Sequence, residues 1–239
     1  MYTKKISAVL LAVALATTMF AGCGKGSGDD TKDTKQQESQ NAVATESIAG
    51  TEGVTETESQ GAQSQYPEIT SDGKVKSYQS VVTVDDAAYE LYTYLDDVAG
   101  NYADSINKVA SALDGKADVY DMVIPLSSEI TFPDNLKDEI NSSDQHQAMQ
   151  DIQAKMNDKV KSVDIYDALM QHRNEYIYFR TDHHWTARGA YYAYTAFCKA
   201  TNTQAPPIAS YSTHNIDGFL GSLYRQTQSS ALKNNPDYV

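Results

Sequence analysis

The pattern of apolar and polar residues divides the chain into three parts. Residues 6–20 form one largely apolar run, and residues 24–68 contain almost no large apolar side chain. From Ile69 onward, apolar residues return at the spacings of helices and strands. A segment as polar as 24–68 cannot bury enough surface to offset the entropy lost on ordering. The pattern therefore predicts a signal peptide over residues 1–22, a disordered acidic linker over residues 23–68, and one folded domain over residues 69–239.

Helix and strand patterns alternate along the predicted domain. Residues 75–84 are rich in β-branched side chains and predict a strand. Asp85 and Asp86 suit the first turn of a helix, because carboxylates favour helix N-termini, and apolar spacing extends that helix to Leu113, with Gly100 as a point where it can bend. Further elements are expected as a buried strand over 117–125, a helix over 147–160, a short strand over 163–166 and a strand over 176–180. The alternation predicts an α/β fold of layered helices and strands, with few core strands.

The most informative stretch joins the last of these strands to an amphipathic helix. Residues 175–180 alternate polar and apolar side chains, and an apolar stripe at helical spacing follows from Ala187 to Cys198. Thr186 stands where its hydroxyl can cap that helix. Asp182 and His184 are therefore predicted on a strand-to-helix turn, which is where open α/β sheets present ligands.

An Asp beside a His has a specific chemical use. A carboxylate bonded to one ring nitrogen fixes the tautomer of the imidazole and leaves the other nitrogen free as a base. A triad would also need a nucleophile, and no Gly-x-Ser-x-Gly sequence occurs. Ser222 and Ser127 are the nearest candidates. The alternative interpretation is a polar turn with Trp185 packed beneath it.

The string from Thr181 to Thr186, followed by Gly189 and a tyrosine-rich helix, resembles the signature of the DHHW proteins. That family is similar to the SGNH-hydrolase-like proteins of bacterial polysaccharide O-acetylation, such as the alginate acetylation proteins. Further matching segments are residues 119–125, 163–167 and 218–224. The resemblance implies an SGNH-hydrolase-like three-layer α/β fold that is incomplete at the C-terminus.

The resemblance also implies roles for the residues of the motif. Asp182 would orient His184, His184 would act as general base, and His183 and Trp185 would support them. The serine nucleophile is expected beyond Val239, so the chain would be an N-terminal part of a longer protein and inactive alone. The implied activity is that of an O-acetyltransferase or acetylesterase acting on an extracellular polysaccharide, with the polysaccharide or an acyl-donor protein as partner.

Two other classes of function remain open. Asp182, His183 and His184 are all able to bind metal, with His172 and His214 elsewhere in the chain, but adjacent histidines rarely point the same way, so no metal and no other cofactor is expected. The other class is a non-catalytic glycan-binding or polysaccharide-assembly lipoprotein. Seventeen tyrosines suit contact with sugars, although most of them fall at core spacing.

The charge, the N-terminal segment and the two cysteines indicate which partners and which cellular location to expect. A net charge of −13 without a basic patch argues against a nucleic-acid partner. Lys4 and Lys5 precede the apolar run, which ends at Ala21-Gly22-Cys23, as in a bacterial lipoprotein signal. Lipidation of Cys23 would anchor the exported protein to the outer face of the bacterial cytoplasmic membrane. Cys198 then has no disulfide partner and is expected to be a buried, unreactive thiol.

Overall fold

The computed structural model describes residues 65–239. The expected signal peptide and Cys23 lie outside the described residues, as does the linker up to residue 64. Tyr66 already packs against the main hydrophobic core and donates a hydrogen bond to Asp167. The described chain is therefore packed three residues before the boundary expected at Ile69.

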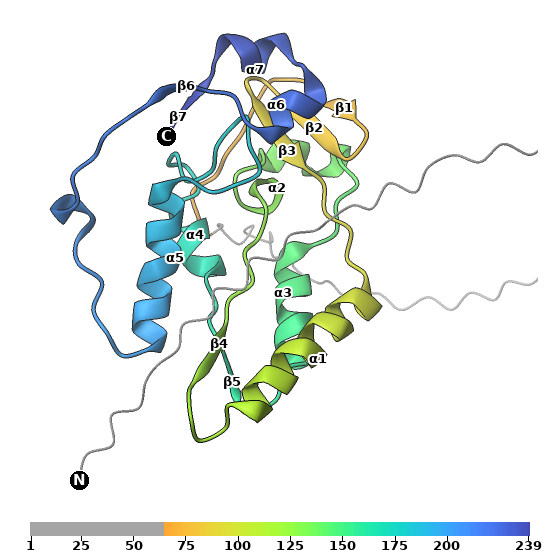
Figure 1. The fold of residues 1–239 in the computed structure, drawn as a ribbon. Helices are drawn as coiled ribbons and strands as arrows, with labels where there is room; N and C mark the ends of the chain where they lie inside the picture. The colour runs from red at the N-terminus through yellow and green to blue at the C-terminus, as the bar shows by residue number, and fades with distance from the viewer. Residues whose placement is uncertain (1–64) are drawn as a thin grey trace, which may run out of the picture. The chain divides into compact units, whose positions relative to one another are not determined.

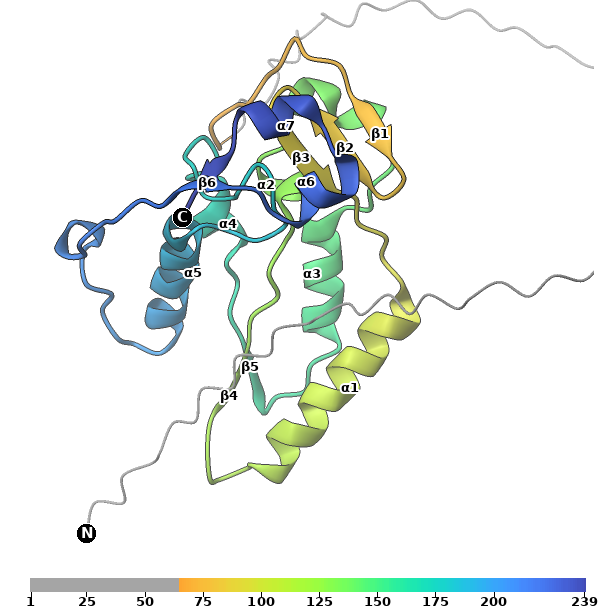
Figure 2. The ribbon, with the colours of Figure 1, turned by 45° about the horizontal axis from the view of Figure 1, so that its top comes forward.

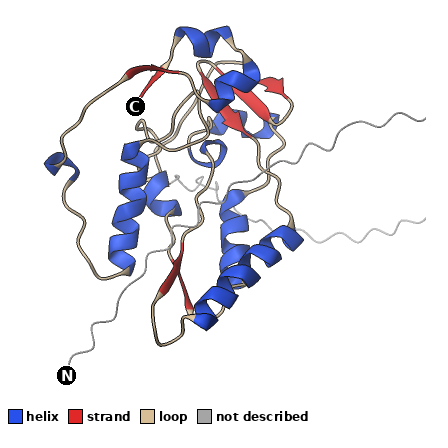
Figure 3. Ribbon diagram, in the orientation of Figure 1, coloured by secondary structure: helices blue, strands red, loops and turns tan. Residues whose placement is uncertain are grey.

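The described residues form a mixed α/β fold, as predicted (Figures 1 and 3). The α-helices are α1 (Asp96–Ala112), α2 (Ser127–Ile130), α3 (Gln145–Ala154), α4 (Tyr166–Met170), α5 (Ala187–Ala200), α6 (Ser222–Thr227) and α7 (Ser230–Asn234). The strands are β1 (Lys76–Tyr78), β2 (Val81–Val84), β3 (Ala87–Glu90), β4 (Val119–Asp121), β5 (Val160–Ser162), β6 (Asp217–Phe219) and β7 (Asp237–Tyr238). Two 3₁₀ helices are η1 (Asp134–Glu139) and η2 (Ile208–Ser210). No helix of this part of the chain is long and apolar enough to cross a membrane.

The first strands differ from the prediction. The expected strand over 75–84 is divided into β1 and β2 by a turn at Gln79, whose φ is 56°. The helix expected from Asp85 is wrong, because Asp85 adopts φ 51° in a second turn and β3 follows in antiparallel register with β2. Helix α1 begins only at Asp96 and continues through Gly100. In β3 the consecutive residues Ala88 and Tyr89 are both buried, and they pack into two different hydrophobic clusters.

A parallel pair of strands has helices on both faces. Strands β4 and β5 pair in register Val119↔Val160, and on one side α1 packs against them through a cluster of Ala110, Val119 and Val160. On the other side Phe197 of α5 meets Tyr120 of β4 edge to face, with ring centroids 5.4 Å apart. Figure 1 shows this order, with α5 on one side of β4 and β5 and with α1 and α3 on the other. The helix–sheet–helix layering expected of the fold is present here.

The C-terminal segment closes over the antiparallel sheet. Leu223 of α6 and Leu232 of α7 are fully buried against Val81 and Ala88, and Figure 2 shows both helices beside β2 and β3.

The strand expected over residues 176–180 does not form. Tyr178 instead makes an isolated antiparallel bridge to Trp185, and the carbonyl of Arg180 accepts a hydrogen bond from the N–H of Ala88 in β3 (2.8 Å).

Arg173 is a buried cation that binds backbone carbonyls and a carboxylate at the edge of the core. Its side chain is 3% exposed, and its guanidinium donates to the carbonyls of Ile130 (2.7 Å) and Phe132 (3.1 Å). It also forms an ion pair with Asp134 (2.9 Å). One cation thus satisfies two carbonyls and one carboxylate between α2 and η1.

We predict that Arg173→Met destabilises the domain by about 3 kcal/mol, because two buried carbonyls lose the guanidinium as donor and Asp134 loses its buried cation. Asp134 then keeps Ile69 and Lys137 as partners. The measurement is the free energy of unfolding in urea. Arg188→Met is the matched control, since Arg188 pairs with Glu175 but is half exposed, and it should cost less than about 1 kcal/mol. Equal losses in the two variants would contradict this account of the core.

Candidate active site

The Asp-His-His-Trp turn is held between a short bridge and the start of α5. The N–H of Phe179 donates to the carbonyl of His184 (3.2 Å), and the N–H of Thr186 donates to the carbonyl of Ile177 (2.9 Å). The Thr186 hydroxyl accepts from the N–H of Gly189 (3.3 Å), so the predicted cap is confirmed. The same hydroxyl donates to the carbonyl of Tyr176 (2.8 Å). The turn is thereby fixed at both of its ends.

Asp182 is buried and accepts hydrogen bonds from His184 and Ser222. Its Oδ1 accepts from the backbone N–H of His184 (3.0 Å) and lies 2.6 Å from His184 Nδ1, while Oδ2 accepts from the backbone N–H of Ser222 (2.7 Å). Burial alone would raise the pKa of Asp182, but the hydrogen bonds from Ser222 and His184 outweigh it and lower that pKa to about 2. The carboxylate is therefore ionised at neutral pH and can only accept hydrogen bonds.

His184 presents its other ring nitrogen to solvent. Because the Asp182 carboxylate accepts, His184 Nδ1 carries the proton of the bond between them, and Nε2 is left with a lone pair. The His184 side chain is 62% exposed, and no hydrogen bond of the described residues occupies Nε2. A buried anion thus orients an exposed imidazole, an arrangement that suits a general base.

His183 lies beside this pair. Its Nδ1 is 2.7 Å from the Ser222 hydroxyl and 3.8 Å from Asp182 Oδ1. The His183 and His184 rings lie next to each other, with centroids 4.0 Å apart and planes tilted by 35°. The two adjacent histidines therefore point to the same side, contrary to the expectation from the sequence.

Asp237, near the end of the chain, binds the residues that precede Asp182. Asp237 is 1% exposed, and its carboxylate accepts from the Thr181 N–H (2.8 Å), the Thr181 hydroxyl (2.6 Å) and the Tyr176 hydroxyl (2.6 Å). The backbone N–H of Arg180 donates to the same carboxylate (3.1 Å). Sequence reasoning missed Asp237, because a carboxylate in an irregular stretch 55 positions from Asp182 carries no local signal.

Gly221 is a second residue that the sequence did not single out. A Cβ atom at Gly221 would lie 2.3 Å from Asp182 Cβ and 2.4 Å from Asp182 Oδ2. Only a residue without a side chain lets this backbone approach the carboxylate and place the Ser222 N–H on it. The matching segment at 218–224 was visible in the sequence, but its contact with the motif was not.

The remaining residues considered in the sequence analysis form no hydrogen bond with the Asp182–His184 pair among the described residues. Ser127 and Ser128 are buried in α2, where the Ser128 hydroxyl accepts from Gln145 (3.1 Å), and no hydrogen bond within the described residues joins them to His184. His172 pairs with Glu175 (2.7 Å). Trp185 is half-buried against the main core, and Cys198 is buried, as expected.

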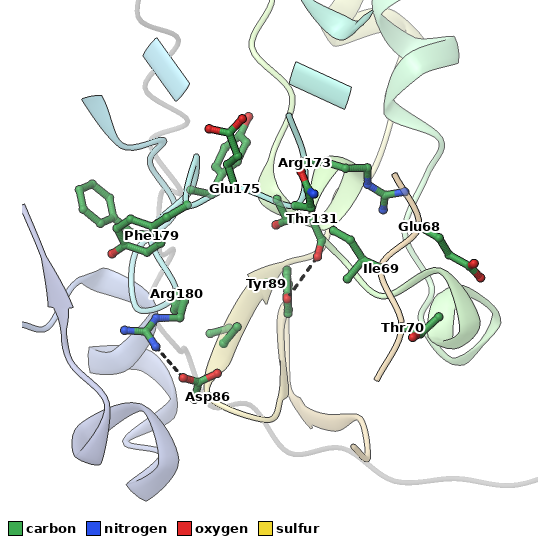
Figure 4. A pocket seen from close by; sticks show the side chains of 15 residues that line it. Glu68, Ile69, Thr70, Asp86, Tyr89, Thr131, Arg173, Glu175, Phe179 and Arg180 are labelled. Carbon is green, nitrogen blue, oxygen red and sulfur yellow. Dashed lines mark hydrogen bonds and ion pairs between the residues drawn. The ribbon is translucent and has the colours of Figure 1, made fainter. Parts of the chain in front are cut away.

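A cavity of about 540 Å³ lies along the segment 173–180. Its wall combines aromatic and charged side chains, among them Tyr89, Phe179, Glu175 and Arg180 (Figure 4). Arg180 forms an ion pair with Asp86 there (2.6 Å), and the Tyr89 hydroxyl donates to the carbonyl of Thr131 (3.4 Å). Asp182 and His184 do not line this cavity.

Comparison with known proteins agrees with the motif. A family model described as "DHHW protein" matches residues 40–239, which confirms the resemblance seen at Thr181–Thr186. The crystal structure of a DHHW family protein from Eubacterium siraeum DSM 15702 is similar at 34% sequence identity and a TM-score of 0.61, over 71% of this chain and 55% of that protein. The present chain thus spans just over half the length of this relative. A search of curated proteins found no match.

Two other solved structures are more distantly similar. Bacillus cereus PatB1 with a sulfonyl adduct shares 16% identity at a TM-score of 0.47, over 61% of this chain and 52% of PatB1. The O-acetyltransferase domain of Pseudomonas putida AlgJ shares 15% identity at a TM-score of 0.39, over 59% of this chain and 55% of the domain.

We predict that Gly221→Ala displaces Asp182 and destabilises the domain by about 1–3 kcal/mol, the usual cost of overpacking. Gly100→Ala is the control, because Gly100 lies inside α1 and a Cβ atom there would have nothing within 4 Å. This control should stabilise the helix by about 0.5–1 kcal/mol. Urea unfolding of the two variants measures the difference, and a stabilising Gly221→Ala would show that the close approach is not required.

Proposed function

The chain belongs to the DHHW family, and we propose that it is part of a cell-envelope enzyme that transfers or removes O-acetyl groups on an extracellular polysaccharide. The observation that carries the proposal is the contact between Asp182 Oδ1 and His184 Nδ1 (2.6 Å), in an imidazole side chain that is 62% exposed. This geometry supports general-base chemistry. The choice of acetyl groups and polysaccharide rests on the resemblance of Asp182-x-His184 to the motif of the acetylation proteins.

In the proposed mechanism His184 Nε2 removes the proton of a serine hydroxyl. The serine oxygen attacks the acetyl carbonyl carbon, the bond to the leaving oxygen breaks, and His184 returns the proton to that oxygen. A sugar hydroxyl or water, deprotonated in turn by His184, then attacks the carbonyl carbon of the acetyl-serine. The bond to the serine oxygen breaks, and His184 returns the proton to that oxygen. Asp182 stabilises the imidazolium that forms in each step and holds the ring in place.

The serine is proposed to come from a part of the protein outside this chain. Among the described residues the Ser222 hydroxyl is engaged with His183, and the serines of α2 make no hydrogen bond with His184. The chain also spans only 55% of the similar DHHW protein. The present residues would then supply the orienting acid and the base of the site.

A non-catalytic glycan-binding role is the second candidate, and the cavity beside Phe179 and Arg180 favours it. Its volume of about 540 Å³ is within the usual size of a ligand pocket. Aromatic rings and charged groups in one wall suit the apolar faces and hydroxyl groups of a sugar. A glycan bound there without turnover would separate this function from catalysis.

The proposed location is the outer face of the cytoplasmic membrane, with the protein anchored through Cys23. We predict that the mature protein begins at Cys23 and carries acyl chains, because Ala21-Gly22-Cys23 follows a charged start and an apolar run. Mass spectrometry of the protein purified from bacterial membranes tests this. A mature N-terminus at another residue, with an unmodified Cys23 thiol, would disprove the anchor.

We predict that Asp182→Asn in the complete protein lowers the turnover number by about 10⁴-fold, the loss seen when a triad loses its Asp. His184→Ala should be at least as damaging, since it removes the base itself. Release or transfer of acetyl groups from an acetylated polysaccharide is the measurement, and thermal unfolding of each variant reports whether the fold is retained.

His214→Ala is the control for these variants, because His214 is exposed and outside the site, and its activity should be unchanged. His183→Ala should fall between the control and His184→Ala. Full activity in His184→Ala would end the catalytic proposal. Retention of the polysaccharide by a protein that never turns it over would favour the glycan-binding candidate.

A further inference from the structure

Asp182, His183 and His184 could act together as metal ligands, whereas the proposed acid–base chemistry uses only Asp182 and His184. Asp182, His183 and His184 can each offer one ligand atom so that the three atoms lie within 4.8 Å of one another. Consecutive residues achieve this because the turn at 181–184 places the two imidazole rings side by side on the side of the Asp182 carboxylate. The proton-transfer role needs only one of these rings.

The spacing of the donor atoms suits a small metal ion. His184 Nδ1 lies 2.6 Å and His183 Nδ1 lies 3.8 Å from Asp182 Oδ1. Ligand atoms at about 2.0–2.1 Å from a tetrahedral zinc ion are about 3.4 Å apart, a value between these two distances. Small rotations of the two rings would therefore bring all three atoms into the first coordination sphere.

Access and donor type also point to a metal. The side chains of His183 and His184 are 40% and 62% exposed, so an ion can reach the donors and a water can fill a further position. Two imidazoles and one carboxylate are a donor set that favours Zn²⁺, Co²⁺, Ni²⁺ or Cu²⁺, whereas Mg²⁺ and Ca²⁺ prefer oxygen ligands.

We propose that Asp182, His183 and His184 bind one divalent transition-metal ion through a carboxylate oxygen and two ring nitrogens, with water completing the coordination. Such binding replaces the hydrogen bond between Asp182 and His184, and the bond between His183 and Ser222, with bonds to the metal. The metal-bound state and the Asp–His pair with its proton on Nδ1 then exclude each other. This inference goes beyond the proposed acetyl chemistry and does not rest on it.

The test is titration of the full chain, without a histidine tag, with Zn²⁺ in a calorimeter and with Co²⁺ followed by its visible absorption. One equivalent of each ion should bind, and Mg²⁺ should not. His183→Ala and His184→Ala should each weaken Zn²⁺ binding by at least about 10–100-fold, the loss that follows removal of even an outer-shell partner of a metal. Both side chains are partly exposed, so thermal unfolding should show that the fold is retained.

Two variants serve as controls. His214→Ala should bind as the wild type does, because this exposed histidine is outside the set. Ser222→Ala should bind at least as tightly, since it removes the hydroxyl that competes for His183 Nδ1 and keeps the backbone N–H that anchors Asp182.

Absence of stoichiometric Zn²⁺ binding would overturn the metal site, as would equal binding by the wild type and His183→Ala. The readout is binding of the ion alone. If this chain binds Zn²⁺ but the complete, metal-free protein shows no acetyl chemistry, the proposed function is contradicted and the metal site stands. If the complete protein transfers or releases acetyl groups but this chain binds no Zn²⁺, the metal site is contradicted and the proposed function stands.

Discussion

Two buried carboxylates attach the Asp-His-His-Trp turn to the C-terminal segment, and the site depends on both. Asp237 accepts hydrogen bonds from the backbone and hydroxyl of Thr181, and Asp182 accepts one from the backbone of Ser222. A buried anion without donors costs several kcal/mol, so each carboxylate holds its donors in place. The segment 217–239 is in this way part of the site, although it contains neither member of the Asp–His pair.

The same hydrogen bonds set the charge of the site. Because the pKa of Asp182 is lowered to about 2 from its ordinary 3.8, the folded state binds this proton less tightly than the unfolded chain does. The stabilisation from the carboxylate is therefore fully present above about pH 4 and is lost as pH falls through about 2. Across the neutral range Asp182 remains an anion, and the exposed His184 ring is the part of the pair that can exchange a proton with a reactant.

The sequence pattern predicted those features that depend on residues close together in the chain. The Thr186 cap, the amphipathic α5 and the contact of Asp182 with His184 follow from spacings of two to four positions along the chain. The helix expected at Asp85 failed because its apolar residues fit a strand as well, and pairing with β2 decides between them. Asp237 and Gly221 meet the motif only through tertiary structure, so no periodicity in the sequence could reveal them.

The two histidines lie beside the same Asp182 oxygen, and this arrangement has two chemical consequences. Asp182 Oδ2 accepts from the Ser222 backbone, and Oδ1 faces both imidazole rings. With a proton on His184 Nδ1, that oxygen orients a base. With a metal ion in place of the proton, the same oxygen would become a ligand and His183 would join it. Which state prevails depends on the free metal concentration, because proton and metal compete for the same nitrogen lone pair.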